Sequence, residues 1–518
     1  MERVNSYSSD DSDDTLVDSS RRRLERQLGQ TEASYFLPSR ESGVNDMYLH
    51  LGFQAPPAIM KRSRVCLVWA ILRLKHPLLA SKVKMYDYED IRFVYLVPES
   101  VSEVLDFADA CLEYRSQSKD VMIDQYLNGP RTLSNEHLSH LVVSQPSEDD
   151  TADSTCDVQN YDLLLCATHF LGDGMALHNF ANDFFALLAS DRVDEDLELL
   201  LTEEWYSKCG AEKKLGNSFE LPRSLEERFP PMADGKFRRA ARRVDFENSQ
   251  SKLIGGHHFP RRSGNRRRTV VPTVSFDSER TKSMLKKCKT HSVSISAALF
   301  SIMNVAWAKT CDSHWELPIM MYSALNLRPV LTAGPSFNDS YWYLAIGYFN
   351  VVLPSFIPQS KEDMEKVFWH RARSAKDQST AAARSPMLVP RSFEMACKRG
   401  KQARAWARED DEKERGTWKA PQPAPVSTTN ANKPPSVALI GLSLLGNLDG
   451  IYKHSTFSKI QLHTLTTGSR QRAGGMLLFG YTFAGKLWIS LGYDEESFDD
   501  RVQHFWENVL LAVDTFLG

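Results

Sequence analysis

The segment spanning residues 161–188 constrains the fold more strongly than any other part of the chain. It begins with the short apolar run 161–168, which has the length and composition of a strand buried on both faces of a sheet. A tight glycine-containing turn follows at 171–174, and residues 176–188 have the apolar spacing of an amphipathic helix. His169 therefore lies where a buried strand ends and a turn begins, and this placement holds its side chain in a defined position.

Apolar periodicity predicts helices and strands along most of the remaining chain. His76-Pro77 ends the first of these helices, because proline lacks a backbone donor and disfavours helical geometry in the residue before it. Gly485 marks the turn of a hairpin close to the C-terminus. We expect helices at 65–75, 101–114, 278–288, 295–310 and 498–516, and strands at 91–97, 269–276, 319–325, 344–352, 437–445, 476–483 and 487–493.

The size and composition of the chain limit its architecture and its class. Its 518 residues exceed one ordinary domain of roughly 150 residues, so we expect either two comparable lobes of one enzyme or several separate domains. A net charge of -3 argues against a protein built mainly to bind nucleic acid. No apolar run approaches the roughly 18 residues of a membrane span, and the N-terminus has no apolar signal region.

The cysteine and histidine patterns provide no evidence for a metal site. The eight cysteines are scattered and include no C-x-x-C pair. This is neither a disulfide framework nor a thiolate metal site, and a cytoplasmic location is the simplest expectation. His257 and His258 are adjacent, but neighbouring side chains project in different directions and no third ligand is spaced nearby. We therefore expect no metal site.

Composition divides the chain into segments. Residues 1–30 are expected to be a disordered tail, because an acidic, serine-rich run cannot bury enough apolar surface to order itself. Residues 31–222 are expected to form an N-terminal lobe, and residues 269–518 a C-terminal lobe that includes a flexible insertion at 398–436. The basic segment 223–268, which contains proline and glycine, is expected to be a crossover loop between the lobes.

The sequence His169-Phe-Leu-Gly-Asp173-Gly174 contains residues suited to acyl transfer onto a hydroxyl. That reaction needs a base for the hydroxyl proton, a donor that stabilises the tetrahedral oxyanion, and a site that holds both substrates in line. A histidine suits the first task, because its ordinary pKa near ~6.5 leaves it mostly neutral at cytosolic pH. Asp173 can order the turn through an internal ion pair. The motif is short, and by itself it is equally compatible with a structural histidine.

Further short motifs occur in a fixed order along the chain. Leu74-Lys-His-Pro-Leu-Leu79 follows the first helix, Ser292-Val-Ser-Ile-Ser-Ala-Ala-Leu299 begins a later one, and Asn326-Leu-Arg328-Pro329 precedes Gly347-Tyr-Phe-Asn350. Together with the histidine motif, they resemble the H-x-x-x-D acyltransferase superfamily, which includes BAHD enzymes, chloramphenicol acetyltransferase and condensation domains. Over residues 30–518 the chain is most similar to fungal O-acetyltransferases of the trichothecene 15-O-acetyltransferase kind.

The resemblance implies a fold and a set of roles. The fold would be α/β, with two lobes of chloramphenicol-acetyltransferase type, mixed sheets and a central solvent channel. CoA would enter the channel from one end and the acceptor from the other, and His169 would act between them as general base. The resemblance also implies that Asp173 points away from the channel and pairs with an arginine, for which Arg328 is the candidate. Gly174 would permit the backbone geometry of the turn.

Two departures from the superfamily pattern affect the assignment. Thr168 stands where condensation domains carry a second histidine, which disfavours a condensation domain. The D-F-G-W-G element of plant enzymes is absent, and residues 443–450 stand roughly in its place. Ser443 and Asn447 are therefore candidate oxyanion donors, although either could simply brace a turn. Further polar candidates on the CoA side are Thr466, Thr467 and Ser469.

The predicted function is that of an acyl-CoA-dependent O-acyltransferase. Acetyl-CoA is the first expected co-substrate, and the acceptor is expected to be a hydroxyl of a secondary metabolite such as a terpenoid alcohol. The alternatives are a non-catalytic member of the same fold that binds a small molecule or a protein, and a condensation-type enzyme that uses a carrier-bound acyl donor. We expect a monomer with no bound cofactor and no nucleic acid. The basic residues within 236–268 could be a solvated loop, a contact to CoA phosphates, or an RNA-binding or nuclear-localisation patch.

Overall fold

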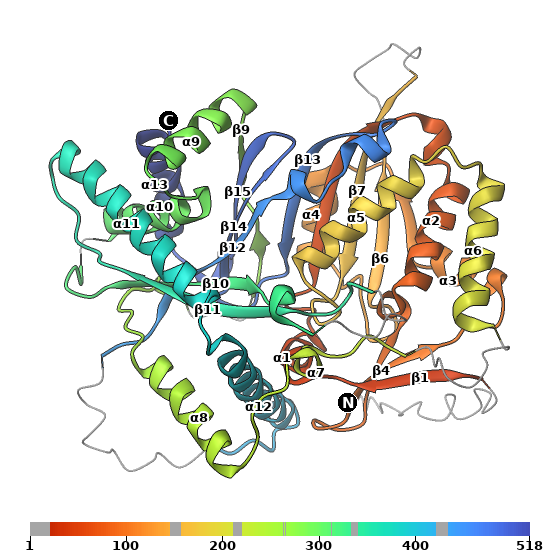
Figure 1. The fold of residues 1–518 in the computed structure, drawn as a ribbon, viewed down its shortest axis with the longest axis horizontal. Coiled ribbons are helices and arrows are strands. Elements are labelled where there is room, and N and C mark those ends of the chain that lie inside the picture. The colour runs from red at the N-terminus through yellow and green to blue at the C-terminus, as the bar shows by residue number, and fades with distance from the viewer. Residues whose placement is uncertain are drawn as a thin grey trace, which may run out of the picture.

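The computed structural model describes residues 21–145, 157–210, 220–262, 264, 266–311, 313–332, 340–420 and 434–518. Within these ranges the chain forms two lobes that lie side by side, each built on a sheet with helices packed against it (Figure 1). The sheets contain both parallel and antiparallel pairs, so the expected α/β class with mixed sheets is confirmed. The acidic run of the predicted N-terminal tail lies outside the described residues.

The sheet of the first lobe has five strands, and its central strand is the apolar run that leads to His169. These strands are β2 (Met47–Ala55), β5 (Leu112–Arg115), β6 (Ser139–Ser144), β7 (Gln159–Ala167) and β13 (Gln461–Ser469), in the order β13-β2-β7-β6-β5. Leu163 and Leu165 of β7 belong to the large core of this lobe, whereas Leu164 and Cys166 belong to a smaller core on the other face. Both faces of β7 are covered, which explains why its residues are apolar without alternation.

Helices cover both faces of this sheet. The large core includes α2 (Arg62–Lys75), α5 (Gly174–Leu188) and α6 (Asp194–Cys209), with α3 (Val101–Asp109) packed against α2. The smaller core is formed with α4 (Lys119–Asn128). As predicted, α2 ends at His76, and Pro77 begins a short 3-10 turn. A separate sheet of three strands, β1 (Arg23–Gln27), β4 (Ile91–Leu96) and β3 (Lys82–Met85), lies at the edge of the lobe (Figure 1).

The second lobe is built on a larger sheet, which also borders the first lobe. Its strands are β8 (Thr269–Val270), β9 (Thr273–Phe276), β10 (Ile319–Asn326), β11 (Ile346–Leu353), β12 (Ala438–Asn447), β14 (Met476–Phe483) and β15 (Lys486–Asp494). One face packs against α9 (Ser278–Thr290), α10 (Ile295–Thr310), α11 (Lys361–Ala383) and α13 (Arg501–Phe516) (Figure 1). On the other face, Phe479 and Tyr481 of β14 join the core of the first lobe. As predicted, Gly485 forms the β14–β15 turn, with φ of 71°.

Strand β13 crosses from the C-terminal half of the chain into the first lobe. It pairs antiparallel with β2 from Gln461 to Ser469, although the strands on either side of it in sequence, β12 and β14, belong to the second sheet. The expected division at residue 268 therefore does not separate the lobes completely. The physical reason is that β13 covers the open edge of β2, whose backbone groups would otherwise lack partners.

Three segments are more ordered than the sequence patterns indicated. Strand β1 begins at Arg23, within the range assigned to the disordered tail, and pairs with β4. Helix α8 (Lys236–Ser251) replaces part of the expected crossover loop, and α7 (Leu225–Arg228) precedes it. Helix α12 (Leu388–Glu414) extends into the expected flexible insertion at 398–436. Lysine, arginine, alanine and glutamate favour helices, so charge alone does not indicate irregular structure in α8 and α12.

Helix α12 is held against α1 (Gln30–Ser39) by a stripe of small side chains. Ala396, Gly400, Ala403 and Ala407 are buried and recur at helical spacing. Small side chains let the two helix backbones approach closely, and a Cβ on Gly400 would overlap the side chain of Gln30. This contact brings the α12 helix below the junction of the lobes (Figure 1).

No single helix among the residues that the structure describes has the length and apolar composition of a membrane span. Helices α9 and α10 reach this length and apolar composition only when they are taken together, and the pair is bent by 91°.

Candidate active site

His169 lies at the end of the central strand of the first sheet. Ala167, the last residue of β7, pairs with Met47 of β2 and with Ser139 of β6, so strands on both sides fix the point where the turn begins. The imidazole Nδ1 of His169 lies 3.0 Å from the carbonyl oxygen of Gly172. A carbonyl oxygen can only accept, so Nδ1 carries the proton and Nε2 of the neutral ring is unprotonated. The turn thus selects the tautomer in which Nε2 can accept a proton.

Asp173 caps helix α5 and points into the protein. Its Oδ1 accepts hydrogen bonds from the backbone N–H of Met175 at 3.1 Å and of Ala176 at 3.2 Å. Its Oδ2 accepts from the N–H of Ala345 at 2.9 Å, and the side chain is almost fully buried. A carboxylate at a helix N-terminus satisfies donors that lack a partner within the helix. Asp173 therefore joins the motif turn to the second lobe.

Arg328 provides the charge that balances Asp173. Its Nη1 lies 2.8 Å from both carboxylate oxygens of Asp173. Its Nη2 donates to the carbonyl oxygens of Tyr341 at 3.1 Å and Tyr343 at 3.0 Å, and its guanidinium lies over the ring of Tyr343. The structure thus brings together the two residues that the resemblance paired, and their ion pair links the His169 turn to the second lobe.

The electrostatic surroundings favour neutral His169. Removal from solvent lowers the pKa of His169 below its ordinary value, the nearby Asp173 carboxylate opposes this shift, and the Arg399 cation adds to it. The lowered pKa favours the neutral imidazole at neutral pH, with its one proton on Nδ1. A neutral imidazole with a free Nε2 has the form that a general base requires.

An aromatic cluster contacts the His169 ring. The ring centroids of Tyr35, on α1, and His169 are 4.4 Å apart at an interplanar angle of 33°. The Tyr35 hydroxyl is hydrogen-bonded to that of Tyr348 on β11, and Arg399 of α12 lies over both tyrosine rings. The sequence reasoning did not identify these residues as part of the site. Tyr348 lies within the quoted Gly347–Asn350 motif, but no local pattern marks Tyr35 or Arg399.

Ser443 lies on the face of the second sheet that turns toward the first lobe. Two positions before it, a Cβ on Gly441 would overlap the ring of Tyr322, which shows that this ring covers the same face. Two positions after it, the Leu445 side chain lies 3.2 Å from the position that a Cβ on Gly174 would occupy. The register of β12 shifts between Leu444 and Gly446, but Ser443 is level with Phe479 of β14, whose side chain joins the core of the first lobe. Ser443, which is partly exposed, therefore lies on the face of β12 turned toward the first lobe.

Asn447 has a different environment. Its side chain accepts a hydrogen bond from the N–H of Asp449 and another from the Thr482 hydroxyl, each at 3.2 Å. These contacts hold the turn that follows β12, as the bracing interpretation expected, and Asn447 is exposed.

Comparison with solved structures identifies the fold. The trichothecene 15-O-acetyltransferase of Fusarium sporotrichioides superposes with a TM-score of 0.72 over 96% of this chain and 95% of that chain, at 13% sequence identity. The epimerization domain of the third module of tyrocidine synthetase B has a TM-score of 0.55, at 13% identity over 95% of this chain and 98% of that chain. Polyketide synthase associated protein 5 from Mycobacterium tuberculosis has a TM-score of 0.54, at 12% identity over 95% and 98%.

The chain has a condensation-domain-like acyltransferase fold. Its α/β class and mixed sheets are those that the resemblance implied. No family model matches the sequence, and no curated protein sequence matches it.

The three CoA-side candidates of β13, Thr466, Thr467 and Ser469, form hydrogen bonds to other residues of the protein. The Thr466 hydroxyl lies 3.3 Å from His50 Nδ1, and the Thr467 hydroxyl donates to the carbonyl oxygen of Tyr48 at 2.9 Å. Ser469 accepts from the Gln471 side chain at 3.2 Å. Ser469 pairs with Met47, which pairs with Ala167, so Ser469 alone of the three lies level with the end of β7.

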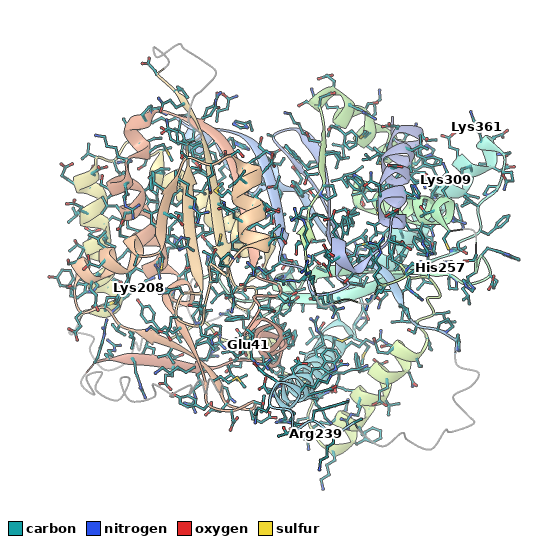
Figure 2. All side chains as sticks on the ribbon, turned by 180° about the vertical axis from the view of Figure 1, so that it is seen from behind. Glu41, Lys208, Arg239, His257, Lys309 and Lys361 are labelled. Atoms are coloured by element: carbon teal, nitrogen blue, oxygen red, sulfur yellow. The ribbon has the colours of Figure 1, made fainter. Side chains whose placement is uncertain are left out.

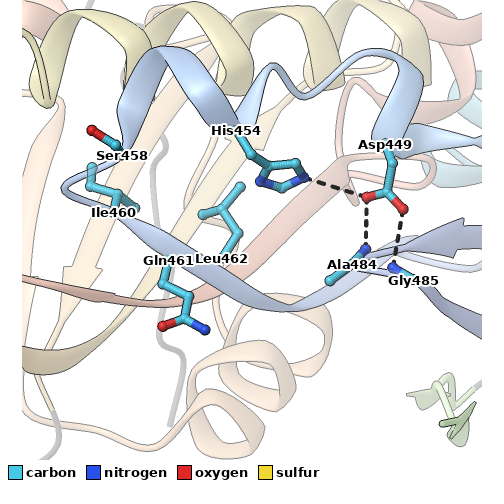
Figure 3. A pocket seen from close by; sticks show the side chains of 8 residues that line it. All are labelled: Asp449, His454, Ser458, Ile460, Gln461, Leu462, Ala484 and Gly485. Carbon is cyan, nitrogen blue, oxygen red and sulfur yellow. Dashed lines mark hydrogen bonds and ion pairs between the residues drawn. The ribbon is translucent and has the colours of Figure 1, made fainter. Parts of the chain in front are cut away.

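A cavity of about 540 Å³ lies at the opposite end of β13 (Figure 3). Asp449 forms one wall, where it accepts hydrogen bonds from the N–H groups of Ala484 at 2.8 Å and Gly485 at 3.1 Å. Gln461, which also lines the cavity, is level with the first residues of β7, and His169 follows the last. The cavity and His169 therefore lie near opposite ends of strand β7. Its lining residues are Asp449, His454, Ser458, Ile460, Gln461, Leu462, Ala484 and Gly485.

The adjacent histidines of the basic segment have structural contacts. His257, labelled in Figure 2, accepts a hydrogen bond from Trp307 Nε1 at 2.9 Å and donates from Nε2 to the Leu317 carbonyl oxygen at 3.0 Å. Both ring nitrogens are therefore occupied within the protein. Over the described part of the chain, no group of three or more His, Cys, Asp and Glu side chains is arranged to hold a metal ion.

Proposed function

We propose that this protein is an acyl-CoA-dependent O-acyltransferase with His169 as general base. The observation that carries the proposal is the hydrogen bond from His169 Nδ1 to the Gly172 carbonyl oxygen, because it leaves Nε2 unprotonated at the junction of the lobes. The structural likeness to a trichothecene 15-O-acetyltransferase supports the same reaction class.

In the proposed reaction, the acceptor hydroxyl donates its proton to His169 Nε2 while its oxygen attacks the thioester carbonyl carbon. The resulting tetrahedral oxyanion needs a hydrogen-bond donor, and Ser443 is the candidate, because it lies on the sheet face that is turned toward the first lobe. Collapse of the oxyanion breaks the carbon–sulfur bond. The proton on Nε2 then passes to the sulfur, which restores neutral His169 and releases CoA.

Asp173 has a positioning role in this proposal. Both of its oxygens are occupied by Arg328 and by backbone N–H groups, whereas the polar contact of His169 is with Gly172. Asp173 therefore orders the turn and does not relay a proton. Gly174 contributes space, since a side chain there would press on Leu445.

We propose acetyl-CoA as donor and a hydroxyl of a secondary metabolite, such as a terpenoid alcohol, as acceptor. The carrier-dependent alternative is disfavoured by Thr168, because a threonine replaces the second histidine of condensation domains. The hydroxyl of Thr168 is fully buried and has no hydrogen-bond partner among the described residues.

The test combines product analysis with a histidine variant. Purified protein is incubated with acetyl-CoA, longer acyl-CoAs or an acetylated carrier protein, each with a panel of terpenoid alcohols, and products are identified by mass spectrometry. We expect O-acetyl products from free acetyl-CoA, their loss in His169→Ala, and their retention in the control His504→Ala, whose side chain is exposed on α13. Near-normal turnover in His169→Ala would exclude the mechanism. Transfer from the carrier protein alone would favour a condensation-type enzyme.

A further inference from the structure

Arg399 differs from the other arginines of helix α12. Arg391 pairs with Asp245, and both Arg404 and Arg408 pair with Glu89. Arg399 forms no ion pair with any carboxylate that the structure describes. Its guanidinium carbon instead lies 4.6 Å from the ring centroid of Tyr348 and 5.3 Å from that of Tyr35. A partly buried cation is thus held by aromatic rings without a counter-ion.

The tyrosines do not neutralise this charge. Burial and the neighbouring Tyr348 raise the pKa of Tyr35 well above its ordinary value, so its hydroxyl is protonated at neutral pH. The two hydroxyls also bond to each other, which uses one donor and one acceptor of the pair. If Arg399 only braced helix α12, a neutral side chain of similar length would do the same without the desolvation penalty of a buried charge. The Arg399 guanidinium contacts both tyrosine hydroxyls, but these are neutral, so its charge is left without an anionic partner among the described residues.

The position of this cation restricts which anion can reach it. Tyr35 contacts both Arg399 and the His169 ring, so one aromatic side chain separates the cation from the proposed base. The diphosphate of CoA is separated from its thioester by the whole extended pantetheine arm, which does not fit so short a spacing. A carboxylate attached close to the reacting hydroxyl, or to the transferred acyl group, does fit.

We propose that Arg399, oriented by Tyr35 and Tyr348, binds a carboxylate of a substrate beside His169 and makes the site selective for that charge. The carboxylate belongs either to a hydroxy-acid acceptor or to the acyl group of a dicarboxylic acyl-CoA. Guanidinium and carboxylate groups match in charge and in the geometry of two parallel hydrogen bonds. This proposal rests on the proposed function, because it assigns the substrate class of the same site.

The experiment measures binding and turnover with matched pairs that differ in one charge. The acceptor arm uses lactate, mandelate and 12-hydroxydodecanoate, each against its methyl ester, with acetyl-CoA as donor. The donor arm uses malonyl-CoA and succinyl-CoA against acetyl-CoA and butyryl-CoA, with neutral alcohols as acceptors. Dissociation constants are measured by calorimetry and products by mass spectrometry, so binding is tested even where no product forms.

The variants separate the charge of Arg399 from its packing. Arg399→Gln removes the charge, Arg399→Lys keeps it without the planar fork, and Tyr348→Phe removes one orienting hydroxyl. Arg408→Gln is the control, because Arg408 lies on the same helix and its guanidinium carbon is 5.0 Å from the ring centroid of Tyr88. Melting temperatures verify that each variant is folded.

We expect the wild-type protein and Arg408→Gln to prefer the carboxylate form in one of the two arms by about 10- to 100-fold, which is the usual effect of a charge-assisted pair. Arg399→Gln should lose this preference, and Arg399→Lys and Tyr348→Phe should retain part of it. The arm that shows the preference identifies the substrate that carries the carboxylate.

Two results would overturn the proposal: no carboxylate preference in either arm, or a preference that persists in Arg399→Gln. Preferential binding of a carboxylate without any acyl transfer would leave the Arg399 site standing and refute the proposed function. Efficient transfer from acetyl-CoA to neutral alcohols by both wild type and Arg399→Gln, with no carboxylate preference in either arm, would do the reverse.

Discussion

Replacing Asp173 by alanine should destabilise the protein by disrupting the junction of its lobes. The substitution removes a helix cap, which usually contributes about 0.5–2 kcal/mol. It also leaves the Arg328 guanidinium without its counter-ion, and breaking a buried ion pair from one side costs about 3–5 kcal/mol. The side chain of Arg328 retains 17% exposure, so some charge is screened. We expect a loss of about 3–5 kcal/mol in the free energy of unfolding.

A double-mutant cycle separates the ion pair from the cap. Arg328→Met alone should cost less, about 2–3 kcal/mol, because Asp173 would retain its backbone donors. Asp173→Ala combined with Arg328→Met removes both charges, so its total should fall short of the sum by about 2 kcal/mol, within the usual range for contacting residues. Urea unfolding at pH 7, followed by tryptophan fluorescence, measures each free energy.

A surface pair provides the control for this cycle. Arg391 and Asp245 are also joined by two hydrogen bonds, but their side chains are 40% and 32% exposed. Their coupling should be only about 0.2–1 kcal/mol. A coupling of Asp173 with Arg328 no larger than that of the control, or an unchanged urea midpoint in Asp173→Ala, would refute the structural role assigned to the pair.

Three further perturbations test other parts of the structure. Burial lowers the pKa of His178 to about 3, so between about pH 6.5 and pH 3 the unfolded state binds a proton that the folded state does not. The free energy of unfolding should therefore fall on acidification by up to about 1.4 kcal/mol per pH unit. This slope should be smaller in His178→Gln, and an identical slope in urea titrations of the variant would contradict the assignment. Ser443→Ala should lower kcat by about 100-fold while leaving the melting temperature unchanged, as loss of an oxyanion donor does, and an unaltered kcat would remove this serine from the mechanism. Gly441→Ala should displace the Tyr322 ring and cost about 1–3 kcal/mol in unfolding free energy, whereas unchanged stability and turnover would show that the ring moves freely.

Short-range features of the site could be predicted from the sequence. The buried strand, the His169 turn and the helix after it follow from apolar spacing and from the glycine-containing turn, since each depends on residues a few positions apart. Gly485 does form the hairpin turn, whereas the capping of α5 by Asp173 was seen only in the structure. The Asp173–Arg328 pair required the motif order as well, because 155 positions separate its members.

Charge and composition were less informative about helices α8 and α12. Their charged residues favour a solvated loop and a solvated helix equally, so composition alone could not decide between them. The buried stripe of small residues on α12 is visible in the sequence, but its meaning depends on α1, which lies far away in the chain. The tertiary contact between these helices determined that α12 is ordered.

The sequence by itself determined where His169 lies, at the end of a buried strand and the start of a turn, because strand and turn are set by neighbours in the chain. Only the tertiary structure decided what surrounds that histidine. Tyr35 and Tyr348 are separated by 313 positions, and Arg399 comes from a third element, yet all three meet beside His169. Strand β13 likewise joins the first sheet because β2 offers it a free edge. Such contacts depend on topology and packing, which local periodicity does not encode.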